Sequence, residues 1–264
     1  MFRYFFTYAD GLPGNVGFRL FGPGHIAWLA AIACSTVFIS LRYKGLSLAR
    51  RRKLELSICW TIFALELLQY LYLIAKDALT PDLLPLHLCG MAVYISLLNA
   101  LRPGKIKREI LYSLCMPGAA MALIFPAWAA YPILNIVSLF CFLIHGLLVI
   151  YPIMLFAGGD LEPDYKNLPK CLLFLILIAL PIYRFNKAFG TNFLFINYPS
   201  PGSPLVLFER WFGNPGYILG ILILIFAVWA ALYLPLVLMR RAEDKAELKP
   251  DDRSRQPAGL KNTR

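Results

Sequence analysis

Seven apolar stretches constrain the fold of this chain more than any other feature. Each has about 20 residues, the length that an α-helix needs to cross a hydrocarbon core of about 30 Å. They lie near 24–41, 55–76, 84–101, 109–130, 132–157, 170–189 and 215–239. Of the 264 residues, 59% are hydrophobic and 16% charged, whereas about a quarter are charged in soluble domains. We therefore predict an all-α membrane bundle of seven transmembrane helices, with residues 1–239 as one domain.

Basic residues are distributed unevenly between the predicted loops. Of 26 Lys and Arg, six lie in 42–53, four in 102–108, two in 158–170 and eight from 240 onward. Because cytoplasmic loops are enriched in Lys and Arg, we predict an amino terminus outside the cell and a carboxy terminus in the cytoplasm. The net charge of +11 then reflects orientation in the membrane rather than nucleic-acid binding. Residues 240–264 have no apolar face, and we expect a disordered cytoplasmic tail.

A histidine and a cysteine, His87 and Cys89, begin the third predicted span in the segment LPLHLCG at 84–90. An ionisable residue inside a membrane is costly, so it is a functional candidate by default. Proline favours the first helical position, so we expect the helix to start at Leu84 or Pro85. Cys89 would then lie about one turn inside, where the positive end of the helix dipole stabilises a thiolate. Gly90 leaves room for a close approach of another chain segment.

The fifth predicted span carries a polar face. Asn135, Ser138, Phe142 and His145 follow one another at steps of three and four residues, which places them on one side of a helix. We expect this face to point into the bundle, although a histidine tied to neighbouring helices by hydrogen bonds is an alternative interpretation. In the second span, Glu66 lies near mid-membrane, where a carboxyl group must be neutral, paired or in a polar cavity.

Further polar side chains gather at the predicted outer ends of the sixth and first spans. They are Arg184, Asn186, Lys187, Thr191, Asn192 and His25. Cations and amides at this level can hold a phosphate or carboxylate group, although basic residues that only anchor a helix look similar. Together with the groups described above, they predict a polar cavity that opens toward the outer leaflet. We expect few buried polar groups in the cytoplasmic half. The remaining cysteines show no metal or disulfide spacing and are interpreted as packing side chains.

Several short segments carry a family resemblance: FG at 21–22 with His25, LPLHLCG at 84–90, EILY at 109–112, FLIHG at 142–146, GTNF at 190–193 and YLP at 233–235. Over about residues 18–236 the chain resembles the YwaF-like bacterial integral membrane proteins and the transmembrane protein 164 acyltransferases. The resemblance implies a lipid acyltransferase that passes a fatty acyl group from a phospholipid to a lysophospholipid through an acyl-cysteine. It places the nucleophile at Cys89 and the catalytic histidine at His145. Bacterial members often have Asp where this chain has Gly90.

These residues suggest a mechanism. His145, oriented by Glu66 or Asn135, would take the thiol proton of Cys89, and the thiolate would attack a phospholipid ester. The thioester would then pass to a lysolipid hydroxyl or to water. The oxyanion site would be shaped by His87 and Gly90. Headgroup contacts would come from the outer residues: Arg184, Asn186, Thr191, Asn192 and His25. We expect no cofactor, metal or nucleic-acid partner.

A membrane transporter or a lipid or small-molecule binding protein with the same cavity is the main alternative. The sequence shows no repeated half of the kind that many transporters have. A retinal protein would need a lysine in the seventh span, which has none. A zinc-dependent lipid hydrolase would need several histidines, with a pair four apart, whereas the three histidines lie on three different spans. Depth alone would also allow a haem between His25 and His87.

Overall fold

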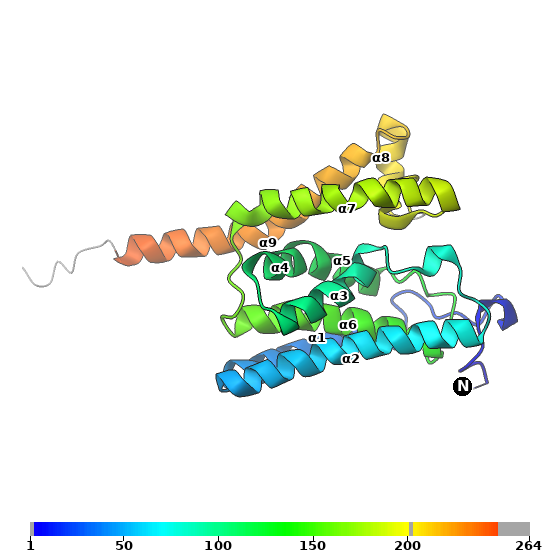
Figure 1. Cartoon of the computed structure of the whole chain (residues 1–264), viewed down its shortest axis with the longest axis horizontal. Coiled ribbons are helices and arrows are strands. Elements are labelled where there is room, and N and C mark those ends of the chain that lie inside the picture. Colours follow the sequence, from blue (N-terminus) through cyan, green and yellow to red (C-terminus); the bar gives the residue numbers. More distant parts are fainter. Residues whose placement is uncertain (1–2, 201–202, 248–264) are drawn as a thin grey trace, which may run out of the picture.

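A computed structural model describes residues 3–200 and 203–247, and this part of the chain is entirely helix and loop (Figure 1). The α-helices are α1 (Pro23–Lys44), α2 (Leu48–Ala75), α3 (Leu88–Leu101), α4 (Lys105–Ile110), α5 (Met116–Ile124), α6 (Ile136–Ala157), α7 (Leu168–Phe189), α8 (Leu205–Phe212) and α9 (Ile218–Glu247). The short 3₁₀ segments are η1 (Ala9–Gly11), η2 (Pro81–Leu83), η4 (Tyr165–Asn167) and η5 (Phe193–Phe195), and η3 (Leu111–Cys115) is a π-helical segment.

Within the described residues, five helices are long and apolar enough to cross a membrane: α1, α2, α6, α7 with the preceding η4, and α9. The other two predicted spans correspond to the short apolar helix α3 and to the run α4–η3–α5. In Figure 1, all seven segments alternate in direction along the long axis of the molecule. The end that carries residues 42–53, 102–108 and 158–170 is called the basic end below. The five long spans confirm the all-α membrane class, and the seven-span count remains a prediction.

The fourth predicted span, 109–130, is interrupted by a proline. Pro117 has no N–H to donate to the carbonyl of Ser113 one turn earlier, and the π-helical segment η3 ends just before it. The indole N–H of Trp229 on α9 donates to that carbonyl instead, at 3.1 Å. Helix α5 ends at Ile124, so residues 125–130 form a loop and not the end of a span.

Helix α6 is the central element of the fold. It packs against α1, α2 and α5. More than half of the residues in its most apolar part are buried, compared with about a tenth in α7 and α9. A helix that is surrounded by other helices needs apolar residues on every side, which explains the almost continuous hydrophobicity of 136–157. The apolar surfaces of α7 and α9 remain exposed, as expected of helices that face lipid.

The carboxy-terminal boundary differs from the prediction. Helix α9 continues past residue 240 to Glu247, so residues 240–247 are helical rather than disordered. The sequence RRAEDKAE over these residues has strong helix formers and no Gly or Pro, which allows the membrane helix to continue. The rest of the predicted tail, 248–264, lies outside the described residues.

Candidate functional site

The start of α3 determines where Cys89 lies. The helix begins at Leu88 with His87 as its N-cap residue, so the expected start at Leu84 or Pro85 is wrong. Leu84 is extended, as favoured for a residue before proline, and the 84–87 segment folds back over the helix. A Cβ atom on Gly90 would lie 2.7 Å from the Cα of Pro85, so the expected close approach at Gly90 is confirmed. Cys89 is therefore the second residue of α3.

The first turn of α3 has unpaired hydrogen-bond donors. The His87 side chain makes no capping bond, and the first helical hydrogen bond runs from Met91 N–H to the His87 carbonyl at 3.0 Å. Among the described residues, the N–H groups of Leu88 and Gly90 have no acceptor, and the N–H of Cys89 donates to the sulfur of its own side chain. Such donors at a helix start, together with the helix dipole, favour negative charge. The thiol of Cys89 thus lies in a local environment that suits an oxyanion.

His145 on α6 has a defined tautomer. Its Nδ1 lies 2.8 Å from the Cys141 carbonyl oxygen, which can only accept, so Nδ1 carries the proton and donates. The Nε2 atom is then an unprotonated acceptor, and no described residue donates to it. The ring stacks on Trp128, with ring centroids 5.1 Å apart and planes 29° apart. Trp128 is 7% exposed, and its indole N–H has no partner among the described residues.

The structure brings Cys89 and His145 onto adjacent, parallel helices without a hydrogen bond between them. Asn99 on α3 donates to the Tyr151 hydroxyl on α6 at 2.8 Å. Cys89 and Cys141 each lie ten residues before this bond on their helices, so they lie at about the same level along the bundle. His145 is four residues beyond Cys141, a rise of about 6 Å, but its ring reaches back to the Cys141 carbonyl.

Glu66 on α2 lies close enough to act electrostatically on both Cys89 and Cys141. Its neighbour Tyr70 donates its single hydroxyl proton to the Leu83 carbonyl at 2.9 Å. Glu66 and Tyr70 also act electrostatically on each other. The described residues show no hydrogen bond from Glu66 to His145. The ring of His145 is oriented by the Cys141 carbonyl instead.

His25 and Asn135, both predicted as site residues, are fully buried structural groups. The Nδ1 of His25 accepts the Phe21 N–H at 3.0 Å, so Nε2 carries the proton and donates to the Leu123 carbonyl at 2.8 Å. This ties the start of α1 to the end of α5. Asn135 caps α6 and donates to the carbonyls of two residues in the amino-terminal segment, at 2.7 and 2.8 Å. Neither side chain orients His145 or has a polar atom free for a substrate.

The amides after α7 are also engaged within their own loop. Asn186 accepts the Thr191 hydroxyl at 2.8 Å and the Phe193 N–H at 2.9 Å, and donates to the Phe193 carbonyl. Asn192 accepts backbone N–H groups of the following loop and donates to the Tyr198 carbonyl at 2.8 Å. Gly190 ends the helix in a left-handed conformation, with φ of 69°. The segment GTNF thus forms a turn that side-chain amides stabilise by hydrogen bonds.

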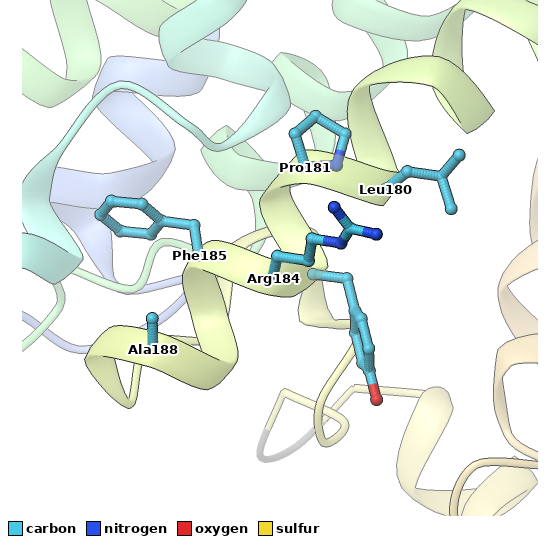
Figure 2. A pocket seen from close by; sticks show the side chains of 6 residues that line it. Leu180, Pro181, Arg184, Phe185 and Ala188 are labelled. Carbon is cyan, nitrogen blue, oxygen red and sulfur yellow. The ribbon is translucent and has the colours of Figure 1, made fainter.

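The side chains of Arg184 and His87 have no polar partners among the described residues. Arg184 is exposed and lines an open, mainly apolar hollow of about 700 Å³ on α7 (Figure 2). The other lining residues are Leu180, Pro181, Tyr183, Phe185 and Ala188. The His87 side chain has no hydrogen bond among the described residues, and its ring lies against Phe193 and Phe195, with centroids 5.0 and 5.2 Å apart. It joins the start of α3 to η5.

The basic end contains buried carboxylates that we did not expect from the sequence. Glu55 and Asp160 both lie within hydrogen-bond distance of the Tyr43 hydroxyl, at 2.8 and 2.9 Å. Arg51 bonds to Asp160 and to three backbone carbonyls, which ties the α1–α2 loop to the α6–α7 loop. Glu109 is 2% exposed.

Glu109 accepts hydrogen bonds from Tyr233, Asn167 and the Asp164 N–H. The segments EILY and YLP, which contribute to the family resemblance, therefore meet through Glu109 and Tyr233. The expectation of few buried polar groups at this end is wrong. The sequence did not reveal these carboxylates, because the loops around them are positively charged and each carboxylate accepts from a donor on a different helix or loop.

A family model described as the TMEM164 family matches residues 20–233, which is most of the chain. The chain belongs to the TMEM164 family. This match covers Glu66, Cys89, His145 and the buried pair of Glu109 and Tyr233. It confirms the family part of the resemblance, whereas the link to YwaF-like bacterial proteins remains a prediction. No curated protein and no solved structure gives a significant match to this sequence.

Proposed function

We propose that this TMEM164-family protein is a lipid acyltransferase that uses Cys89 as nucleophile and His145 as base. The observation that carries the proposal is the tautomer of His145, because its proton is fixed on Nδ1 and its Nε2 is free to accept another. The family membership and the unpaired N–H groups around Cys89 support the same chemistry. The substrates are membrane phospholipids and lysophospholipids.

In the proposed first half-reaction, Nε2 of His145 takes the Cys89 proton as the sulfur attacks a phospholipid ester carbonyl. The S–C bond forms, the ester C–O bond breaks, and His145 returns the proton to the departing lysophospholipid oxygen. An acceptor lysophospholipid reverses these steps on the thioester, and water in its place gives hydrolysis. The N–H groups of Cys89 and Gly90 would stabilise the oxyanion. For this chemistry, the Cys89 thiol and the His145 ring move into hydrogen-bond contact when a lipid binds.

The remaining residues take supporting roles in the proposal. Arg184, at the hollow on α7, would pair with the headgroup phosphate, with the lipid chain along the apolar lining residues. His87 would line the entrance beside η5. Glu66 would act as an electrostatic neighbour of the thiol. We assign Asn135, Asn186, Thr191, Asn192 and His25 to holding the site together through their hydrogen bonds.

We also propose seven spans with the amino terminus outside and the basic end in the cytoplasm. The alternating direction of the seven segments in Figure 1 and the excess of Lys and Arg at one end support it. Tyr198 is 50% exposed at one end, and the Lys105 side chain is 67% exposed at the other. Tyr198→Cys should react with an impermeant maleimide in intact cells, and Lys105→Cys only after permeabilisation. The reverse pattern would refute the orientation.

The experiment that tests the enzyme proposal incubates purified protein with phospholipid carrying a labelled acyl chain. Wild type should form an adduct that hydroxylamine releases, as a thioester requires, and Cys89→Ala should form none. Cys141→Ala is the matched control, because this cysteine also lies near Glu66 and next to His145 but is not the proposed nucleophile. Equal labelling of wild type and Cys89→Ala, or loss of labelling only in Cys141→Ala, would refute Cys89 as nucleophile.

One observation favours a transporter as the second candidate. Charged groups line a hollow of about 300 Å³ at the basic end, among them Lys105, Arg108, Glu109 and Asp160. Ionisable groups inside a membrane bundle often mark a transport pathway. Lipid or solute flux in vesicles that is unchanged by Cys89→Ser would support transport. Flux that disappears together with acyl transfer would support the enzyme.

A further inference from the structure

A buried hydrogen-bond donor without an acceptor lies beside the proposed base. The Trp128 side chain is 7% exposed, and its indole N–H has no partner in the described part of the chain. Buried Trp N–H groups normally find an acceptor. Trp229, which is buried to a similar extent, does so, because its N–H donates to the Ser113 carbonyl. The contrast between the two tryptophans makes Trp128 the exception that needs an explanation.

The ring stacked on Trp128 belongs to His145, whose Nε2 is an acceptor without a donor. A buried donor and a half-buried acceptor, both without a partner among the described residues, therefore lie in neighbouring rings with centroids 5.1 Å apart. A ligand that satisfies both must bring an acceptor oxygen for the indole N–H and a proton for the imidazole. An ester carbonyl oxygen with an attacking thiol or hydroxyl beside it has this combination.

We propose that the indole N–H of Trp128 binds the carbonyl oxygen of a phospholipid ester beside His145 and stabilises the oxyanion that forms on it. This inference rests on the proposed acyl transfer and adds a catalytic residue to it. As the nucleophile attacks and the carbonyl carbon becomes tetrahedral, the former C=O electron pair moves onto the oxygen, and the indole proton stays on nitrogen throughout. The negative charge collapses back when the leaving oxygen departs. A donor in a site without water stabilises this charge more than it stabilises the neutral ester.

Trp128→Phe tests the proposal because it keeps an aromatic ring against His145 and removes only the donor and the second ring. The matched control is Trp28→Phe, since Trp28 belongs to the same aromatic cluster, stacked on Phe142 with centroids 5.0 Å apart. We expect Trp128→Phe to slow formation of the hydroxylamine-labile adduct by about 100- to 1,000-fold, the usual effect of losing an oxyanion donor. The half-saturating lipid concentration should change little, and Trp28→Phe should react like wild type.

A second measurement does not depend on the covalent chemistry or on the folding of Trp128→Phe. In Cys89→Ala, the indole N–H band in the ultraviolet resonance Raman spectrum should shift to its hydrogen-bonded position when diacyl phosphatidylcholine is added. Dialkyl ether phosphatidylcholine, which lacks the carbonyl groups, should leave the band unchanged. An N–H band that does not respond to the diacyl lipid, or a shift of equal size with the ether lipid, overturns the inference.

The two proposals fail separately. If wild type forms the adduct and folded Trp128→Phe forms it at the same rate, the role of Trp128 is refuted and acyl transfer stands. If the diacyl lipid shifts the band but no adduct forms on Cys89, the ester site stands and the acyl-cysteine is refuted.

Discussion

Replacing His25 by phenylalanine should destabilise the fold, because this histidine joins two helices through both ring nitrogens. Phe keeps the aromatic contacts with Phe18 and Phe142 but leaves the Leu123 carbonyl buried without a donor. An unsatisfied buried acceptor costs about 1–3 kcal/mol, and the lost bond from the Phe21 N–H adds about 1 kcal/mol. We therefore expect His25→Phe to lower the free energy of unfolding by about 2–4 kcal/mol.

The matched control is His87→Phe, because the His87 side chain makes no hydrogen bond with the described residues and its ring already contacts two phenylalanines. This change should alter the free energy of unfolding by less than about 0.5 kcal/mol. Both variants can be unfolded in mixed micelles by increasing the fraction of sodium dodecyl sulfate, with helix content followed by circular dichroism. Equal midpoints for His25→Phe and wild type would refute the structural role of His25 and reopen its predicted role in substrate binding.

Two further substitutions have clear expected outcomes. Gly90→Ala brings a methyl group 2.7 Å from the Pro85 Cα, which forces the start of α3 to shift, and should change the alkylation rate of Cys89 by tenfold or more. Gly118→Ala, whose new methyl group has ordinary contacts, should leave that rate unchanged, and equal rates in the two variants would argue against the close approach. Tyr233→Phe removes the hydroxyl that donates to buried Glu109 and should lower the unfolding free energy by about 1.5–3 kcal/mol. The same change at exposed Tyr183 should have no measurable effect, and a stable Tyr233→Phe protein would contradict a structural role for this contact.

Hydropathy and helical spacing predicted the membrane class and the inward-facing side of α6, because both depend on the average character of many residues. The start of α3 could not be predicted, since Pro85 fits a first helical turn as well as the folded-back loop that Gly90 permits. The roles of His25 and Asn135 were also hidden. Their partners are backbone carbonyls and N–H groups. Nearly every residue has both groups, so such partners leave no pattern in the sequence.

Trp128 was missed for a related reason. A tryptophan in an apolar chain is interpreted as a packing or interface residue, and only the structure shows that its N–H lacks an acceptor. Glu109 and Tyr233 are 124 residues apart. Their sequence segments belong to the family resemblance, but nothing in the spacing indicated that they meet.

Buried polar groups without a hydrogen-bond partner occur at both ends of the described bundle, and at the basic end they include Glu55 Oε2, Arg52 Nη1 and Arg108 Nε. At the basic end, Glu55, Glu109 and Asp160 each have a donor from another helix or loop, so their hydrogen bonds fix how the helices pack. Around Cys89, the N–H groups of Leu88 and Gly90, the Nε2 of His145 and the N–H of Trp128 have no partner among the described residues. Unpaired groups inside a membrane protein reduce its stability. The carbonyl oxygen of a lipid ester would accept from the Trp128 N–H, so binding of the ester would stabilise the protein. The thermal midpoint of Cys89→Ala should therefore rise with diacyl phosphatidylcholine and stay unchanged with its dialkyl ether analogue, and equal stabilisation by both lipids would show that these groups do not form the ester site.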